Sequence, residues 1–221
     1  TFTVVLNMQP TDDVTIDLSS SDTTEGTVSP SSLTFTPANW NIPQTVTITG
    51  VDDNVDDDDV SYTIEIAAAQ SNDPAYDGLD PADVSVTNID DDTAGVTVSA
   101  ISGSTSEKGG TATFTVKLNS QPTANVTINL SSSDTTEGTV SPSSLTFTPA
   151  NWNIPQTVTV TGVKDDIADG NVTYTIITSA AISADPKYNG MAVPDVTVIN
   201  IDDPSSVKDT NWQVFLPFIR R

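Results

Sequence analysis

Residues 18–47 read LSSSDTTEGTVSPSSLTFTPANWNIPQTVT, and the same letters return without a change at residues 130–159. The offset is 112 residues, and it also aligns residues outside the identical block, such as Phe2 with Phe114 and Tyr76 with Tyr188. A fixed self-similarity of this kind indicates an array of like modules. The period is longer than a solenoid repeat and is typical of one independently folding β-sandwich domain.

Strand signals dominate both copies, because apolar side chains alternate with threonine and other polar residues. In the second copy, the expected strands run through residues 96–98, 111–118, 126–130, 143–147, 157–162, 172–176 and 196–198. We therefore predict an all-β chain of two tandem immunoglobulin-like β-sandwich domains, with purely antiparallel or mixed sheets. The predicted boundaries are residues 1–92 for repeat 1, 93–204 for repeat 2 and 205–221 for a C-terminal tail. Trp40 and Trp152 are expected to plug the cores under a loop.

The first copy begins at what is the second strand of the second copy. Residues 1–6 (TFTVVL) align with residues 113–118, and nothing in the first copy corresponds to residues 95–99. We expect the first domain to lack its first strand and to expose backbone groups and apolar core. No signal-peptide pattern follows Thr1, which predicts either a processed form or a fragment.

The tail supplies a surplus apolar segment, WQVFLPFI at residues 212–219, after which only Arg220 and Arg221 follow. It stands where the first strand of a third domain would begin. We predict that it fills the first-strand vacancy of another copy, with either face of the strand turned inward. The predicted donor residues are Trp212, Val214, Phe215, Leu216 and Phe218, and the predicted acceptor residues are Phe2, Val4 and Leu6.

Composition limits the classes of function. The chain has 30 Asp and Glu against 7 Lys and Arg, a formal net charge of −23, so nucleic acid and anionic membranes are poor partners and cations are natural ones. The absence of cysteine and histidine excludes disulfides, the usual zinc sites and Ser-His-Asp chemistry. No apolar run approaches the roughly 20 residues of a membrane helix. The few glutamates are scattered and no nucleophile–base pair is visible, so we expect a protein that is not an enzyme.

Clustered carboxylates on loops suit calcium, a hard cation that takes oxygen ligands. Such acids occur in the linker after repeat 1, in the loop VDDNVDDDDV and, more sparsely, in the matching loop of repeat 2, and Glu107 lies on a turn expected to face the linker end. The alternative is a set of solvated, mutually repelling loops that only keep the protein soluble. The sequons at Asn125, Asn129 and Asn171 permit glycosylation.

The pattern TFTVxL…SSSDTTEGTVSPSSLTFTPxNWNxPQTVTVTGVxDD…VxNIDD resembles the Calx-β-like repeats of large bacterial surface proteins, over nearly all of residues 1–203. The resemblance implies an extracellular tandem array, often adhesive and often binding calcium near domain junctions. Lys164 replaces the counterpart of Asp52. The tail VFLPFIRR is similar to the short C-termini of secreted proteins in some filamentous bacteria. The metal ligands implied by position, with the linker acid Asp92 added, are Asp52, Asp53, Asp90, Asp91, Glu107, Asp165 and Asp166.

The function predicted from the sequence is a structural subunit of an extracellular fibre on the bacterial cell surface. It would assemble as a homopolymer by head-to-tail donation of residues 212–219, with calcium as cofactor at the internal joint. One alternative is a fragment of a calcium-stiffened multi-repeat adhesin that contacts a surface ligand or glycan. A second alternative is a carbohydrate-binding accessory module of a secreted enzyme. Neither nucleic acid nor a membrane span is expected.

Overall fold

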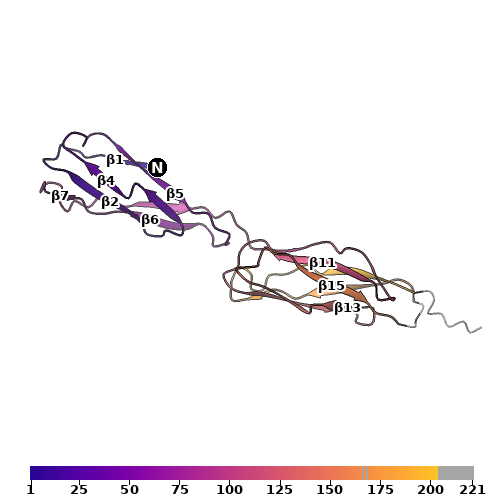
Figure 1. Cartoon of the computed structure of the whole chain (residues 1–221). Helices are drawn as coiled ribbons and strands as arrows, with labels where there is room; N and C mark the ends of the chain where they lie inside the picture. Colours follow the sequence, from indigo (N-terminus) through magenta and orange to yellow (C-terminus); the bar gives the residue numbers. More distant parts are fainter. Residues whose placement is uncertain (166, 168, 204–221) are drawn as a thin grey trace, which may run out of the picture. The chain divides into compact units, whose positions relative to one another are not determined.

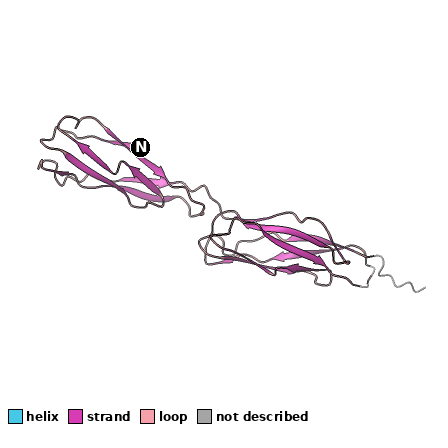
Figure 2. Ribbon diagram, viewed as in Figure 1, coloured by secondary structure: helices cyan, strands magenta, loops and turns pink. Residues whose placement is uncertain are grey.

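The structure is a computed structural model, and it describes residues 1–165, 167 and 169–203. The chain divides into two compact units, Thr1–Asp92 and Thr93–Arg221. Each unit is built from β-strands joined by loops (Figures 1 and 2). Across the described ranges there is no helix long and apolar enough to cross a membrane.

Unit 1 is a sandwich of two antiparallel sheets. One sheet has the order β1-β5-β3, and the other has the order β4-β2-β6-β8 with β7 added beside β2. Every strand pair in this unit is antiparallel. The strands are β1 (Phe2–Val4), β2 (Val14–Ser20), β3 (Gly26–Ser29), β4 (Ser32–Phe35), β5 (Gln44–Gly50), β6 (Val60–Ile66), β7 (Gln70–Ser71) and β8 (Val84–Asn88).

Unit 2 repeats this plan with a further strand in each sheet. Its sheets have the orders β13-β15-β11-β9 and β10-β18-β16-β12-β14, with β17 beside β12. The pair β10–β18 is parallel and the other pairs are antiparallel, so the sheets are mixed. The strands are β9 (Val96–Val98), β10 (Thr105–Ser106), β11 (Thr111–Leu118), β12 (Val126–Ser132), β13 (Gly138–Ser141), β14 (Ser144–Phe147), β15 (Gln156–Gly162), β16 (Val172–Thr178), β17 (Ile182–Ser183) and β18 (Val196–Ile201).

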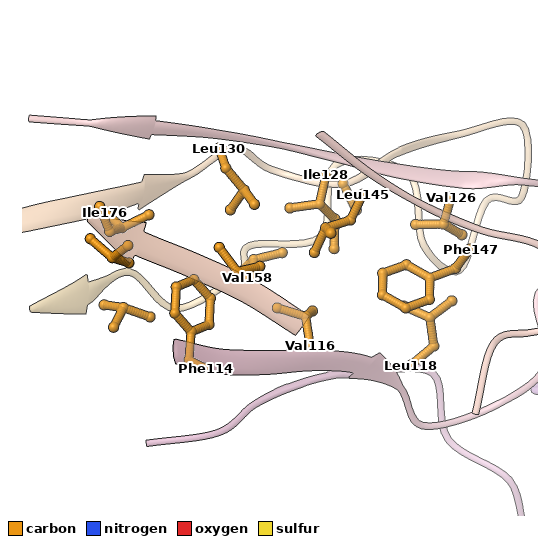
Figure 3. Packing of buried hydrophobic residues seen from close by; sticks show 14 of the residues in the cluster. Phe114, Val116, Leu118, Val126, Ile128, Leu130, Leu145, Phe147, Val158 and Ile176 are labelled. Carbon is orange, nitrogen blue, oxygen red and sulfur yellow. The ribbon is translucent and has the colours of Figure 1, made fainter. Parts of the chain in front are cut away.

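The core of unit 2 follows from the period-2 alternation of its strands, which turns every second side chain inward. Phe114, Val116 and Leu118 on β11 point toward Ile128 and Phe147 of the facing sheet (Figure 3). All five side chains are at most 1% exposed. The alternation of threonine with apolar residues is therefore a reliable guide to which face of each strand is buried.

Trp40 and Trp152 pack against the edges of the two cores, as predicted. Each also bonds through its backbone carbonyl to the last residue of β11 in unit 2 or to its counterpart just beyond β1 in unit 1. The Leu6 N–H donates to the Trp40 carbonyl oxygen at 3.1 Å, and the Leu118 N–H donates to the Trp152 carbonyl oxygen at 3.0 Å. The aromatic side chain and the strand end are thus held together in both repeats.

The prediction of two tandem sandwiches is confirmed, and in the described residues of unit 1 no strand occupies the position that β9 takes in unit 2. In unit 2, β9 pairs with one edge of β11 and β15 with the other. In unit 1, β1 pairs with β5, and within the described residues no strand pairs with its opposite edge. The parallel strand β10, which extends the second sheet of unit 2, likewise has no counterpart beside β8 in the described chain.

Candidate functional site

Acidic loops meet at one end of unit 1 around a cavity of about 420 Å³. The residues that line it come from the turn before β3, from the loop between β5 and β6, and from the chain that follows β8. Nine of the twelve lining positions carry a carboxylate or a carboxamide. They are Glu25, Asp52, Asp53, Asp57, Asp58, Asn88, Asp90, Asp91 and Asp92.

Asp90 organises this cavity by accepting backbone hydrogen bonds from the β5–β6 loop. The N–H groups of Asp57 and Asp58 donate to its Oδ2 at 3.1 and 3.0 Å. Nearby, Asn88 Nδ2 donates to Glu25 Oε2 at 3.3 Å and to the Val51 carbonyl oxygen at 2.9 Å. These bonds tie three separate loops together, so the carboxylates converge although they lie far apart in the sequence.

Burial, together with the crowding of negative charge, raises the pKa of two of these carboxyl groups. Loss of hydration inside the acidic cavity, with repulsion from Asp53 and Asp90, raises the pKa of Asp57 above its ordinary value. The pKa of Asp92 is raised for the same reasons, with Asp91 as the foremost charged neighbour. A raised pKa means that the ionised cluster is held together against repulsion, which a bound cation would relieve.

Unit 2 brings its carboxylates close enough to share one ion. Glu107, Asp169 and Asp202 each offer an oxygen within 4.8 Å of the others, and Glu137, Asp165 and Asp169 form a second such group. The two groups share Asp169, so they surround adjacent positions. Among the described residues these are the groups of three or more acidic ligands with that spacing.

One oxygen in this cluster points to a missing partner. Asp202 Oδ1 is buried and accepts no hydrogen bond, whereas its Oδ2 accepts one from the Gly170 N–H at 3.2 Å. A buried carboxylate oxygen without a partner is costly, and a metal ligand is one of the roles that explain it. Oxygen-only donors at this spacing fit calcium or another hard divalent cation.

Glu137 is the buried member of its group and is 6% exposed. Burial raises its pKa, the hydrogen bond from Asn200 opposes that rise, and the charges of Asp169 and Asp165 add to it. Asn200 Nδ2 lies 3.2 Å from Glu137 Oε2. Glu137 thus carries an ionisable group that a cation would hold in its charged form.

A lysine lies beside the acidic cluster of unit 2. Lys108 Nζ is 3.1 Å from Asp203 Oδ1, with the lysine side chain 72% and the aspartate side chain 10% exposed. The Asp203 N–H also donates to Glu107 Oε2 at 3.0 Å. Lys164, which replaces the counterpart of Asp52, is exposed. Lys108 thus pairs with Asp203, which is not a member of either carboxylate group, and both groups remain acidic.

The structure places the sequence-predicted ligands in two separate groups. Asp52, Asp53, Asp90, Asp91 and Asp92 line the cavity of unit 1. Glu107, predicted to act with those first-repeat acids, belongs with Asp169 and Asp202 of its own repeat, and Asp165 belongs with Glu137. Asp166 lies outside the described residues.

Sequence reasoning missed Glu25, Glu137 and Asp202, and it placed Asp57 and Asp169 in acidic loops without naming them as ligands. Glu25 and Glu137 stand in identical DTTEGT turns that look like any exposed loop. The available signal was the repeat itself. The offset of 112 residues relates Asp90 to Asp202 and Asp57 to Asp169, so each linker acid implied a partner in the other copy.

A second feature of unit 1 is the open edge of β1, where the predicted acceptor residues lie. Phe2 and Val4 are partly buried and Leu6 is 8% exposed, and all three belong to or pack against the core. An apolar cavity of about 410 Å³ opens beside Val4 and Leu6. The predicted donor residues Trp212, Val214, Phe215, Leu216 and Phe218 lie outside the described residues.

The three sequon asparagines, Asn125, Asn129 and Asn171, are all exposed in unit 2. Asn171 Oδ1 accepts a hydrogen bond from the Asp202 N–H at 3.2 Å, so this residue borders the acidic cluster. Glycosylation of these sites stays a prediction.

The fold and the clustered loop carboxylates define a tandem β-sandwich protein with acidic loop sites. A sequence model of the Calx-beta domain matches residues 1–93 and again residues 90–205. The chain therefore belongs to the Calx-beta domain family, as the sequence resemblance implied. A comparison with curated protein sequences found no match.

The solved structures matched in a further comparison share little sequence with this chain. The crystal structure of CBD12 from CALX1.2 is 14% identical, with 91% of this chain and 92% of that chain covered and a TM-score of 0.41. The crystal structure of calcium binding domain CBD12 of CALX1.1 is 14% identical, with 91% of each chain covered and a TM-score of 0.39. Domains 4 and 5 of the S-layer protein SbsC are 16% identical, with 85% of this chain and 75% of that chain covered and a TM-score of 0.34.

Proposed function

We propose that this chain is a non-enzymatic structural subunit of an extracellular fibre, in which unit 1 accepts a β-strand donated by residues 212–219 of another copy. One observation carries the proposal. In unit 2 the edge of β11 is covered by β9, whereas in unit 1 the corresponding edge of β1 is open in the described chain. An unpaired edge with apolar residues behind it is a template for another strand.

Burial at matched positions supports this proposal. Phe114 and Val116 are 1% and 0% exposed, whereas their counterparts Phe2 and Val4 are only partly buried. The facing sheet shows the same difference, because Val198 is 1% exposed and its counterpart Val86 is partly buried. Apolar surface is therefore left on both sheets of unit 1, beside β1 where unit 2 has β9 and beside β8 where unit 2 has β10.

The proposed donor has the chemistry that this groove requires. Residues 212–219 (WQVFLPFI) carry large apolar side chains on both faces of an extended strand. Burying each such side chain stabilises by roughly 1.5–3 kcal/mol before the costs of ordering the strand. Since the donor and the acceptor lie on different parts of the chain, the contact is heterologous and extends into a fibre.

In the same proposal, the acidic clusters of both repeats bind calcium. The cation would offset the burial and the repulsion that raise the pKa of Asp57 and Asp92, and it would supply the partner that Asp202 Oδ1 lacks. Glu107, Asp169 and Asp202 would hold the ion in unit 2, with Glu137 and Asp165 beside them. Calcium would serve as a structural ion, because it takes six to eight oxygen ligands and pins the loops that provide them.

A second candidate function is a calcium-stiffened segment of a long surface adhesin. The observation in its favour is that Asp91 and Asp92 line the acidic cavity and directly precede Thr93, where unit 2 begins. An ion bound there would restrain the connection between repeats. In this candidate the groove of unit 1 would be covered by a preceding strand of the same long chain. Both candidates place the protein outside the cell.

A binding measurement separates the two candidates. A labelled peptide of residues 205–221 is titrated with the chain that lacks those residues, and fluorescence anisotropy follows the complex. Strand donation predicts saturable one-to-one binding, and a peptide of scrambled sequence should bind at least tenfold more weakly. Equal binding of both peptides, or none, would remove the fibre proposal and favour the adhesin segment.

A further inference from the structure

We propose, on the basis of the strand donation above, that residues 212–219 dock in one register only, with Trp212 at an apolar cavity of unit 1 and Phe215 against Val5. The cavity and the exposure of Val5 are properties of the acceptor alone. They give the donor an anchor and a fixed position along β1. The partner is thus a second copy of this chain, whose Trp212 is recognised by the cavity.

The cavity measures about 410 Å³ and opens at the end of β1. Its walls are apolar, and they include Val4, Leu6, Ile16, Ala69 and Tyr76. Its rim carries the exposed apolar residues Met8 (64% exposed) and Leu79 (54% exposed) together with the polar residues Asn7 and Asp80. A mainly apolar hollow with exposed apolar residues at its rim is typical of the pockets that hold hot-spot aromatic side chains.

In unit 2 the corresponding place is occupied by the segment around β9. Ala94 and Val96 pack against the core there, Val96 pairs with Leu118, and the Asn119 N–H donates to the Gly95 carbonyl oxygen at 2.9 Å. Leu118 and Asn119 are the counterparts of the cavity residues Leu6 and Asn7. The cavity of unit 1 is therefore the space that the first strand covers in unit 2.

The β9 segment gives the template for the register. Val96 lies opposite Leu118, Thr97 opposite Lys117 and Val98 opposite Val116, and the flanking Ala94 and Ile101 also pack against the core. The inward positions are thus 94, 96, 98 and 101. An offset of 118 residues puts an apolar donor side chain at all four inward positions, namely Trp212, Val214, Leu216 and Ile219.

The outward face agrees with the same register. Phe215 takes the place of Thr97, opposite Val5 of the acceptor. Val5 is 43% exposed, and the residue at this position in unit 2 is Lys117. Aromatic and β-branched residues directly opposite each other form a favourable cross-strand pair. In this register Phe215 covers position 5 of unit 1, which is apolar, whereas the matching position 117 of unit 2 carries a lysine.

The competing register is shifted by two residues. It places Gln213 opposite Val5 and Pro217 at the position of Ile101, and it leaves Leu216 outside the groove. Its advantage is one hydrogen bond, because the Ser99 N–H donates to the Thr115 carbonyl oxygen at 2.9 Å and a proline at that position cannot donate. An edge carbonyl can bond to water instead, whereas an unburied Leu216 loses its transfer free energy.

Cysteine trapping in the full chain tests the register, since the natural sequence has no cysteine. The variant V5C/F215C should form a ladder of disulfide-linked oligomers under mild oxidation, and V5C/Q213C should link at least fivefold less. Directly opposite residues are close enough for a disulfide after small adjustments. Preferential linking of V5C/Q213C would overturn the register and leave strand donation standing. Linking within one chain, or no oligomers with either pair, would overturn strand donation itself.

Substitutions at the cavity rim test the anchor. Leu79→Asp should raise the concentration needed for assembly at least tenfold, because it puts a charge where the indole of Trp212 would lie. Ile42→Asp is the matched control, since Ile42 is 59% exposed and does not line the cavity. Trp212→Ala should match Leu79→Asp, and the two changes together should cost little more than either alone. Equal effects of Leu79→Asp and Ile42→Asp would overturn the anchor.

Discussion

The two repeats share a 30-residue block without a difference, and its residues are buried almost alike in both copies, yet the repeats differ outside that block. Tyr62 and Tyr174 are 5% and 3% exposed, so the centres of the two sandwiches are equivalent. The difference is confined to the edge that β9 and β10 cover in unit 2. There Asn200 is 1% exposed and accepts a hydrogen bond from Thr105 at 3.0 Å, whereas its counterpart Asn88 is partly buried.

The two facing sheets form without the first strand, and the first strand completes the sandwich. The alternating strands and the identical block suffice for two facing sheets, because unit 1 forms them within the described chain. In unit 2 the first strand, β9, closes the groove. The chain that follows it supplies one acidic ligand, Glu107. Glu107 has no counterpart among residues 1–92. A donated strand would therefore restore the groove of unit 1 but not that carboxylate.

The largest expected effect is the contrast between Phe114→Ala and Phe2→Ala in a chain without residues 205–221. Removing the fully buried Phe114 should destabilise unit 2 by about 3–5 kcal/mol through lost burial and a cavity. Phe2 is partly exposed, so the cost in unit 1 should be less than half as large. Hydrogen exchange of peptides outside the identical block resolves the two units. Equal costs would contradict the open groove.

Calcium should stabilise both units, and by separable amounts. At a free concentration one hundred times Kd, binding raises the free energy of unfolding by about 2.7 kcal/mol. Asp202→Asn should remove this gain from unit 2 alone, and Asp90→Asn from unit 1 alone. Denaturation with calcium and with a chelator measures both. A calcium gain that survives Asp202→Asn in unit 2 would place the ion elsewhere.

A smaller effect is expected from neutralising the buried glutamate of each site. Glu137→Gln should stabilise calcium-free unit 2 by up to about 1 kcal/mol, because it removes a buried charge that is also repelled by Asp169 and Asp165. With calcium present, the same change should be destabilising. The matched variant Glu25→Gln reports on the same position in unit 1. If Glu137→Gln were destabilising without calcium as well, the account of its raised pKa by burial and repulsion would be contradicted.

The smallest effect on stability, and a large one on assembly, is expected for Val5→Lys. It gives unit 1 the residue that unit 2 carries, and an exposed site of this kind should change the free energy of unfolding by no more than about 0.5 kcal/mol. Assembly should weaken, because Phe215 would lose its apolar neighbour. Light scattering against protein concentration measures this. Unchanged assembly would show that Val5 does not meet the donor.

Strand positions could be read from the sequence wherever the alternation ran long enough to define a face. The strands β11, β12, β15 and β16 have seven or eight residues each, and the alternation located all of them. The strands β10, β13 and β17, of two to four residues, were missed, whereas the equally short β9 and β14 were located from their inward-facing apolar residues. They pair only because the longer strands bring them to an edge.

The composition predicted that acidic sites exist, but it did not predict which residues belong to each site. Clusters such as the six aspartates of the β5–β6 loop were enough to predict a cation site from composition alone. Glu25 and Asp57 join that site because a turn before β3 and a loop before β6 meet at one end of the sandwich. That meeting depends on strand order, which the sequence pattern did not contain. Glu107 was grouped with the linker acids for the same reason, since its place beside β18 depends on the parallel strand β10.

Electron microscopy of the purified full chain, beside the same chain without residues 205–221, tests the central claim most directly. Strand donation predicts fibres from the full chain and separate molecules from the shortened one, with fibres restored when the donor segment is returned. Separate molecules in both samples, or fibres in both, would contradict the account.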